Sequence, residues 1–272
     1  MRATDEMPII RKGNDRLVGW YDNSEFEGEP VTSVTEDITL YALWDEPIEL
    51  DEESSDNIGT IEANDGNLVN VVLRRSFTAN GYWYTLVLPF DVTAEQLAET
   101  FGAGTEVTVL QSSYKKSETA IYLNFVKQTT IQAGVPCLFK PGKDIEEVAV
   151  FRDVTINNTT PQKSTALVNM VGLYAPDDVE LNDNNYYLGN TNYLHEYVEL
   201  YQNTKGFRAY FHFNETLSAG CAPRVMFHED TTTELEDILE ITSPIVEKAI
   251  RDGQLIIIRD GKEFNAQGQL IQ

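Results

Sequence analysis

Apolar residues are most concentrated in one stretch of the chain, Gly81–Val92, which reads GYWYTLVLPFDV. It favours a strand because β-branched and aromatic residues crowd it, Asn80 and Gly81 supply a turn before it, and Pro89 cannot donate a ladder hydrogen bond. Nearly every position from Tyr82 to Phe90 is apolar, so a single solvated face is not expected. The pattern predicts a central strand covered on both sides.

A short helix is predicted directly after this stretch. Thr93 precedes the sequence AEQLAE, and Gln96 follows the threonine by three residues. A hydroxyl residue followed at that spacing by glutamine is the capping-box pattern of a helix start. Gly102 is then expected to end the helix, which is the clearest one in the middle of the chain.

Short apolar or alternating runs, separated by Gly, Asn, Asp and Pro, recur between residues 60 and 228. Each run predicts a strand. The predicted strands are Leu68–Arg75, Tyr82–Phe90, Val107–Gln111, Ile121–Phe125, Val135–Phe139, Val148–Ile156, Thr165–Leu173, Tyr186–Leu188, Val198–Tyr201, Phe207–Phe213 and Arg224–Phe227. So many strands with one short helix predict an all-β fold whose main domain is a β-sandwich.

The N-terminal residues predict two further strands, Val18–Tyr21 and Ile38–Trp44. Here Gly19-Trp20-Tyr21 and the closing Asp37–Trp44 (DITLYALW) resemble the second half of the Listeria-Bacteroides repeat, the β-grasp-like B-repeat module of bacterial surface proteins. The resemblance implies a partial β-grasp-like repeat and an extracellular or cell-surface location. The first residues lack the apolar core of a signal peptide, so we expect an N-terminally shortened chain.

Two polar, acidic segments without apolar periodicity are interpreted as linkers. The predicted division is 1–46 for the partial repeat, 47–58 for an acidic linker, 59–228 for the β-sandwich, 229–243 for a second linker and 244–272 for a C-terminal β tail. In the tail, Pro244–Ile250 is predicted to form one helical turn. Tight turns then join three short strands, Gln254–Arg259, Lys262–Asn265 and Gln269–Gln272.

A second resemblance rests on motifs that keep their order along the chain, among them Trp83–Asp91, Ala133–Pro141 and Gly206–Phe211. Together they are similar to uncharacterised secreted proteins of gut Bacteroidetes, which implies kinship without an activity. The tail is similar to the C-terminal segments of such proteins, including type IX sorting tails. Whether it is an address or a strand meander that completes the fold stays open.

The net charge of the chain limits the classes of partner that it is expected to bind. The 272 residues have 42% hydrophobic and 10% aromatic content, which is enough to bury a core, and a formal net charge of -24. Nucleic acid and anionic membrane surfaces would be repelled by that charge. No apolar run is long enough to span a bilayer, so direct membrane insertion is not expected. The oligomeric state is not indicated.

The sequence contains none of the common catalytic motifs. His195, His212 and His228 have no metal-ligand spacing, and His212 is predicted on the strand face opposite Phe211. Nucleophile elbow, P-loop and dinucleotide fingerprint do not occur. The sequence therefore predicts no catalytic residue and no enzyme.

The two cysteines are also unpromising as catalytic or metal-binding groups. Cys137 and Cys221 form no CxxC pair, and whether they are bridged stays open. Cys137 follows a proline inside an apolar strand without a local basic group, so it is not a candidate nucleophile.

One metal, calcium, is suggested by a loop rich in hard oxygen ligands that contains Asp177, Asp178 and Asp183. The spacing is not that of an EF-hand. Turn chemistry, in which Asp and Asn bond their own amides, explains the same residues.

The remaining functional signal is aromatic. Tyrosines crowd the region from Tyr186 to Tyr201, with asparagines among them. Sugar-binding surfaces stack rings on such side chains beside amide groups. The candidate ligand-binding residues are Tyr186, Tyr187, Asn190, Tyr193 and Tyr197. The predicted function is a non-enzymatic extracellular binding or adhesion module for a glycan or a host or bacterial surface protein, and a structural stalk and a carbohydrate-active enzyme are the alternatives.

Overall fold

The computed structural model describes residues 7–117, 120–181, 184–189, 193–197, 203–217, 221 and 223–228, together with three strands near the C-terminus. The chain divides into two compact units, Met1–His228 and Glu229–Gln272. Strands far outnumber helices among the described residues, and α2 (Ala94–Phe101) is the helix that the capping box predicts. The all-β fold is therefore confirmed.

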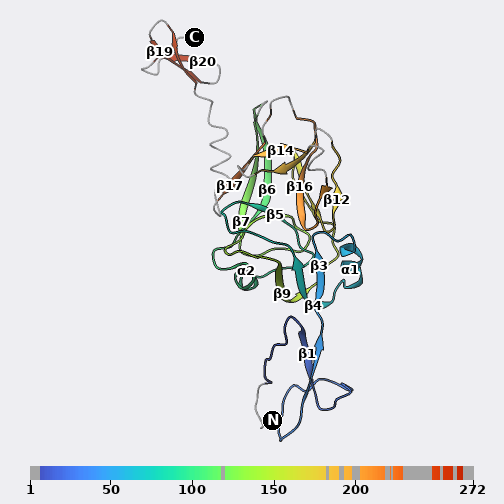
Figure 1. Cartoon of the computed structure of the whole chain (residues 1–272). Coiled ribbons are helices and arrows are strands. Elements are labelled where there is room, and N and C mark those ends of the chain that lie inside the picture. Colours follow the sequence, from blue (N-terminus) through green and yellow to red (C-terminus); the bar gives the residue numbers. More distant parts are fainter. Residues whose placement is uncertain are drawn as a thin grey trace. The chain divides into compact units, whose positions relative to one another are not determined.

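Two five-stranded sheets build the larger part of the first unit (Figure 1). The first has the order β17-β7-β6-β8-β5, from β5 (Tyr84–Leu86), β6 (Glu106–Ser117), β7 (Ala120–Gln128), β8 (Cys137–Lys140) and β17 (Arg224–His228). The second has the order β10-β11-β16-β13-β14, from β10 (Gln162–Ser164), β11 (Val168–Leu173), β13 (Asn185–Leu188), β14 (Leu194–Glu196) and β16 (Arg208–Phe213). Among the described strands of these two sheets, β17 alone joins its neighbour, β7, in parallel.

The two sheets share one apolar core because alternate residues of their strands point toward each other. Leu123 and Phe125 of β7 lie in the same buried cluster as Met170 of β11 and Phe211 of β16. The rings of Phe125 and Phe211 meet across the sheets with centroids 6.4 Å apart. This packing supports the predicted β-sandwich-like character.

A third sheet packs on a second apolar core, to which β5, β6 and β8 of the first five-stranded sheet also contribute. It contains β3 (Ile48–Asp51), β4 (Leu68–Arg74) and β9 (Val148–Thr155), and α2 contacts β9. The core is aromatic, with Phe101 4.5 Å from Phe139 and 5.6 Å from Phe151 between ring centroids in edge contacts. A second helix, α1 (Asn57–Ala63), follows β3 and buries Ile61 in the same cluster.

The remaining strands form small sheets. The N-terminal hairpin pairs β1 (Arg16–Tyr21) with β2 (Tyr41–Asp45), and a short ribbon pairs β12 (Asp177–Asp178) with β15 (Asn203–Thr204). In the second unit, β18 (Glu247–Arg251), β19 (Gln254–Arg259) and β20 (Lys262–Asn265) form a meander. Among the described residues, no helix is long and apolar enough to cross a membrane.

Within the apolar stretch Gly81–Val92, Leu86–Phe90 and Val92 are buried, whereas Gly81, Tyr82 and Asp91 are exposed. The central strand predicted over Tyr82–Phe90 is wrong. Only Tyr84–Leu86 form a strand, β5, and it lies at the edge of its sheet with β8 as its single neighbour. Beyond it the backbone leaves the ladder, because the Val87 amide donates to the Phe207 carbonyl. Side-chain burial of an irregular segment thus imitates the pattern of a central strand.

Two further predictions are corrected. The unstructured linker over 47–58 is wrong for Ile48–Asp51, which form β3 parallel to β4 and bury Leu50 completely. The helical turn over Pro244–Ile250 is wrong because Glu247–Arg251 form β18, paired antiparallel with β19. The predicted strands Val198–Tyr201 and Gln269–Gln272 and the linker 229–243 lie outside the described residues.

The capping box of α2 gives a test of the helix start. The Gln96 amide donates to the Thr93 hydroxyl over 3.2 Å, and the Thr93 amide donates to the Gln96 side chain over 2.9 Å. Thr93→Ala is expected to lower the free energy of unfolding by about 1 kcal/mol. Chemical denaturation measures this, and Thr93→Ser, which keeps the hydroxyl, should stay near wild type. Equal losses in both variants would show that the hydroxyl does not act as a cap.

Candidate functional site

A row of aromatic rings lies on the outer face of the second five-stranded sheet. It is made of Tyr187 on β13, His195 on β14, Tyr197 just after β14 and Tyr210 on β16, and is called the tyrosine row below. Ring centroids are 5.6 Å apart for Tyr187 and His195, 5.5 Å for Tyr187 and Tyr197, and 6.2 Å for Tyr197 and Tyr210. The row exists because these positions alternate with core residues such as Phe211.

The rings of the row differ in their exposure. His195 is exposed, and Tyr187 and Tyr210 are half-buried. Tyr197 is only 8% exposed, and its hydroxyl shares a 3.0 Å hydrogen bond with the Thr204 hydroxyl on β15. Burial raises the pKa of Tyr197. Two half-exposed tyrosines and a histidine therefore form the accessible part of the row.

A carboxylate-bearing segment runs along one side of the row. The Asn185 side chain, on the same outer face, donates to the Glu180 carbonyl over 2.8 Å and contacts the His212 ring nitrogen at 2.8 Å. The pKa of Tyr210 is raised by burial first and then by the negative charges of Asp177 and Glu180. Aromatic rings and carboxylates thus occur together on this face.

The predicted ligand-binding residues lie in different environments in the structure. Tyr186 is 4% exposed and points into the core, where its hydroxyl donates to Glu196 over 3.0 Å, so its assignment to a ligand surface is wrong. Tyr197 belongs to the row, but its burial removes it from direct contact with a ligand. Tyr193 has the Arg224 guanidinium 4.5 Å from its ring centroid. Asn190 lies outside the described residues.

Tyr210 was missed by the sequence analysis, although a signal was present. The predicted strand over Phe207–Phe213 alternates Phe211 and Phe213 with Tyr210 and His212. Once the phenylalanines are assigned to the core, the period of two places Tyr210 on the outer face beside the strand that carries Tyr187.

The predicted calcium site is not assembled by the described residues. Asp177 and Asp178 are consecutive in β12 and exposed, so their side chains point to opposite sides of that strand. Asp183 lies outside the described residues. Within the part of the chain that the structure describes, no three His, Cys, Asp or Glu residues are grouped so that they could hold a metal ion.

The cysteines are not bonded to each other. Cys137 on β8 is buried, and its thiol donates to the Leu86 carbonyl over 3.4 Å. Burial raises the pKa of the Cys137 thiol to about 12, although the positive charge of Arg75 acts in the opposite direction. The group therefore stays protonated and unreactive at neutral pH.

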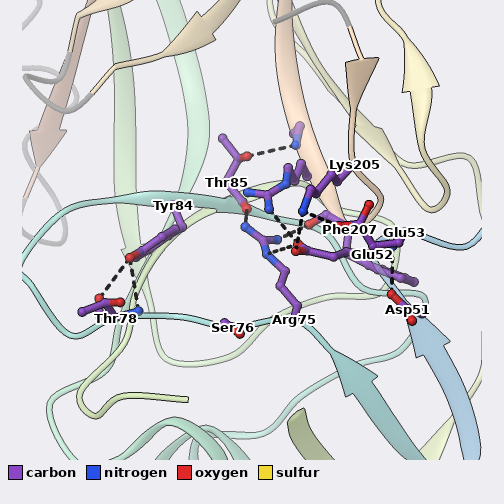
Figure 2. Close-up of polar contacts among 12 residues, drawn as sticks. Asp51, Glu52, Glu53, Arg75, Ser76, Thr78, Tyr84, Thr85, Lys205 and Phe207 are labelled. Carbon is purple, nitrogen blue, oxygen red and sulfur yellow. Dashed lines mark hydrogen bonds and ion pairs between the residues drawn. The ribbon is translucent and has the colours of Figure 1, made fainter. Parts of the chain in front are cut away.

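A buried arginine is the feature that the sequence analysis did not find (Figure 2). The Arg75 side chain is 1% exposed and donates from Nη1 to the Phe207 carbonyl and from Nη2 to the Thr85 carbonyl, the latter over 3.0 Å. Its Nε lies 3.5 Å from a Glu52 carboxylate oxygen. Burial lowers the pKa of Arg75 to about 9, with Arg208 acting in the same direction, so the guanidinium remains charged at neutral pH.

Glu52 forms ion pairs with the basic side chains around Arg75. It accepts a hydrogen bond from Arg208 over 2.7 Å and pairs with Lys205 at 3.4 Å, while its own side chain is 15% exposed. Glu52, Arg75, Lys205 and Arg208 are called the charge cluster below. Glu52 follows β3, Arg75 follows β4, Lys205 follows β15 and Arg208 begins β16, so the cluster has a structural role where these strands meet.

Two pockets among the described residues are small or open. One of about 90 Å³ is lined by Ile121, Leu167 and Phe213 among others, with Glu215 as its single carboxylate. A shallower depression of about 400 Å³ is lined by Asp45, Glu46 and residues of the β4 start, and Asp45 pairs with Arg16 at 3.8 Å. Glycoside hydrolysis needs two carboxylates flanking an enclosed sugar. Neither pocket provides that arrangement.

Comparisons of the chain with protein-family models, with curated proteins and with solved structures found no match. The resemblances based on the sequence motifs therefore stay predictions.

Removing Arg75 is expected to destabilise the fold. Arg75→Ala deletes donors to two carbonyls and leaves a void, so the free energy of unfolding should fall by about 3–5 kcal/mol. The neighbouring Arg74 is exposed and pairs with Glu49, so Arg74→Ala should change stability little. Urea denaturation compares the two variants. Equal effects would contradict a special role for Arg75.

The burial of Cys137 is tested by thiol labelling. In a Cys221→Ser variant the remaining thiol, Cys137, is expected not to react with Ellman's reagent at about pH 8 while the protein is folded. It should react once the chain is unfolded in denaturant, which is the control. Fast labelling under native conditions would contradict the burial of this group.

Proposed function

We propose that this chain is a non-enzymatic extracellular binding module and that the tyrosine row is its ligand surface. One observation carries the proposal: Tyr187 and Tyr210 lie half-exposed, with His195, on an outward sheet face. Aromatic side chains with a polar edge stack well on the apolar faces of sugar rings, while neighbouring polar groups bond their hydroxyls. A glycan is therefore the favoured ligand class.

Polar groups beside the row suit such a ligand. The His195 ring is exposed beside Tyr187, and the paired side chains of Asn185 and His212 lie on the same outer face. The exposed His195 ring can donate or accept a hydrogen bond beside the tyrosines, while the buried Asn185 holds the His212 ring in place. The pockets, by contrast, lack an enclosed pair of carboxylates, so the proposal favours binding over hydrolysis.

A structural stalk or scaffold is the second candidate. Only Glu46 and Pro47 separate β2 of the N-terminal hairpin from β3 of the third sheet. Additional contacts tie the two parts, because the Asn70 side chain donates to the Asn14 carbonyl over 2.8 Å and Arg16 pairs with Asp153 at 3.2 Å. Closely joined modules are suited to presenting other domains at the surface of a cell.

The proposed location is extracellular or at the cell surface of a member of the Bacteroidetes, with a glycan or a host or bacterial surface protein as partner. The support is the pattern of Gly19-Trp20-Tyr21 and Asp37–Trp44, which resembles the repeats of bacterial surface proteins.

A glycan panel tests the binding function. Wild-type protein is expected to bind at least one plant, mucin or bacterial glycan, and Tyr187→Ala should weaken that binding at least about tenfold, because it removes a stacking ring. Tyr122→Ala is the matched control, since Tyr122 is half-buried on β7 of the other sheet and contacts Tyr114. Binding on glycan arrays and then by calorimetry gives the comparison.

Two results would contradict the proposal. The first is that the folded wild-type protein binds no glycan of the panel. The second is an equal loss of binding in Tyr187→Ala and Tyr122→Ala, which would place the ligand elsewhere or reflect general destabilisation. Either result would favour the scaffold role.

A further inference from the structure

The tyrosine row is bordered by negative charge. The ribbon strand β12 carries Asp177 and Asp178, both exposed, and its partner β15 carries Thr204, whose hydroxyl bonds Tyr197 of the row. The same segment continues to Glu180, whose carbonyl accepts from Asn185 on the outer face. The ribbon is thus fastened to the face at two points. Because Asp177 pairs with Thr204 across the ribbon, its side chain lies on the side that faces Tyr197, whereas Asp178 points to the other side.

The nearest positive side chains are already engaged. Lys205 follows β15 and pairs with Glu52 and Glu53, and Arg208 of β16 donates to Glu52 over 2.7 Å. Within the described residues, Asp177 and Asp178 are in no ion pair. The positive charge of Arg208 acts on the buried Tyr197 but is paired with Glu52, whereas the accessible Tyr210 faces the negative charges of Asp177 and Glu180.

We infer that the ligand of the tyrosine row is an amine-bearing sugar, such as an oligosaccharide of unacetylated glucosamine. This inference rests on the proposed function and adds a charge preference to it. An ammonium group near the face of a tyrosine ring is attracted by the ring electrons, and a neighbouring carboxylate strengthens the attraction. A sugar that carries a carboxylate would be repelled by the same aspartates and by the chain's net charge of -24.

The test compares three oligosaccharides of equal length by calorimetry at mildly acidic pH, where sugar amines are charged. They are an N-acetylglucosamine oligomer, the same oligomer without acetyl groups, and a galacturonic acid oligomer. The amine form is expected to bind about three- to tenfold more tightly than the acetylated form, and the acidic form should not bind. Raising the salt concentration should reduce the difference, because exposed charges are screened.

Charge variants separate a local effect from a general one. The double variant Asp177→Asn with Asp178→Asn should abolish the preference for the amine form while leaving binding of the acetylated form. A control double variant, Glu36→Gln with Asp37→Asn, removes the same charge from an exposed site in the N-terminal segment. It should keep the preference.

The outcomes distinguish the inference from the proposed function. Equal binding of the amine and acetylated forms, with Tyr187→Ala still harmful, would overturn the charge preference and leave the binding function standing. An amine preference reduced equally by both double variants, or unaffected by Tyr187→Ala, would reveal general charge attraction and overturn the inference. No binding of any of the three forms would overturn the inference, and silence across the wider glycan panel would overturn the proposed function as well.

Discussion

The guanidinium of Arg75 is the interaction on which the arrangement of the sheets depends. Removing a charge from water costs several kcal/mol, so such a group is retained only where partners surround it. Here the partners are the Thr85 carbonyl in β5 of the first five-stranded sheet, the Phe207 carbonyl just before β16 of the second, and Glu52 just after β3. Apolar packing alone does not fix how sheets are placed, because it has no direction. The hydrogen bonds of the planar Arg75 guanidinium are directional, so they fix how the sheets are placed.

The charge cluster also determines where the candidate site lies. Strand β16 begins at Arg208, directly after Phe207, and both residues are bound to the cluster. Two residues later the same strand presents Tyr210 to the outer face. Since the Ala209 amide donates to the Thr85 hydroxyl over 3.0 Å, the start of β16 is held on both sides. The tyrosine row is therefore placed on a strand that the core has anchored, as precise binding surfaces require.

Sequence patterns predicted the elements that are long enough to show a regular alternation of apolar and polar residues. β4, β9 and β16 were found within one to a few residues, and the capping box located α2. β3 and β12 were missed because four and two residues are too few to show a period of two. In the site, Tyr187 was found but Tyr186 was wrongly grouped with it, since crowding along the chain hides the alternation of faces. The burial of Arg75 could not be predicted from the sequence. Its carbonyl partner Phe207 lies 132 positions later, and no local pattern around Arg75 indicates that contact.

That separation along the chain has a consequence for how the protein forms during synthesis. While Arg75 and β4 are already made, Phe207 and Arg208 have yet to be translated, and β17, which joins β7 in parallel, comes later still. Until then Arg75 stays hydrated, and the strands of the first sheets that are already synthesised have unpaired edges. Contacts this distant slow folding and expose apolar strands in the meantime. The core can therefore close only after β16 and β17 have been synthesised.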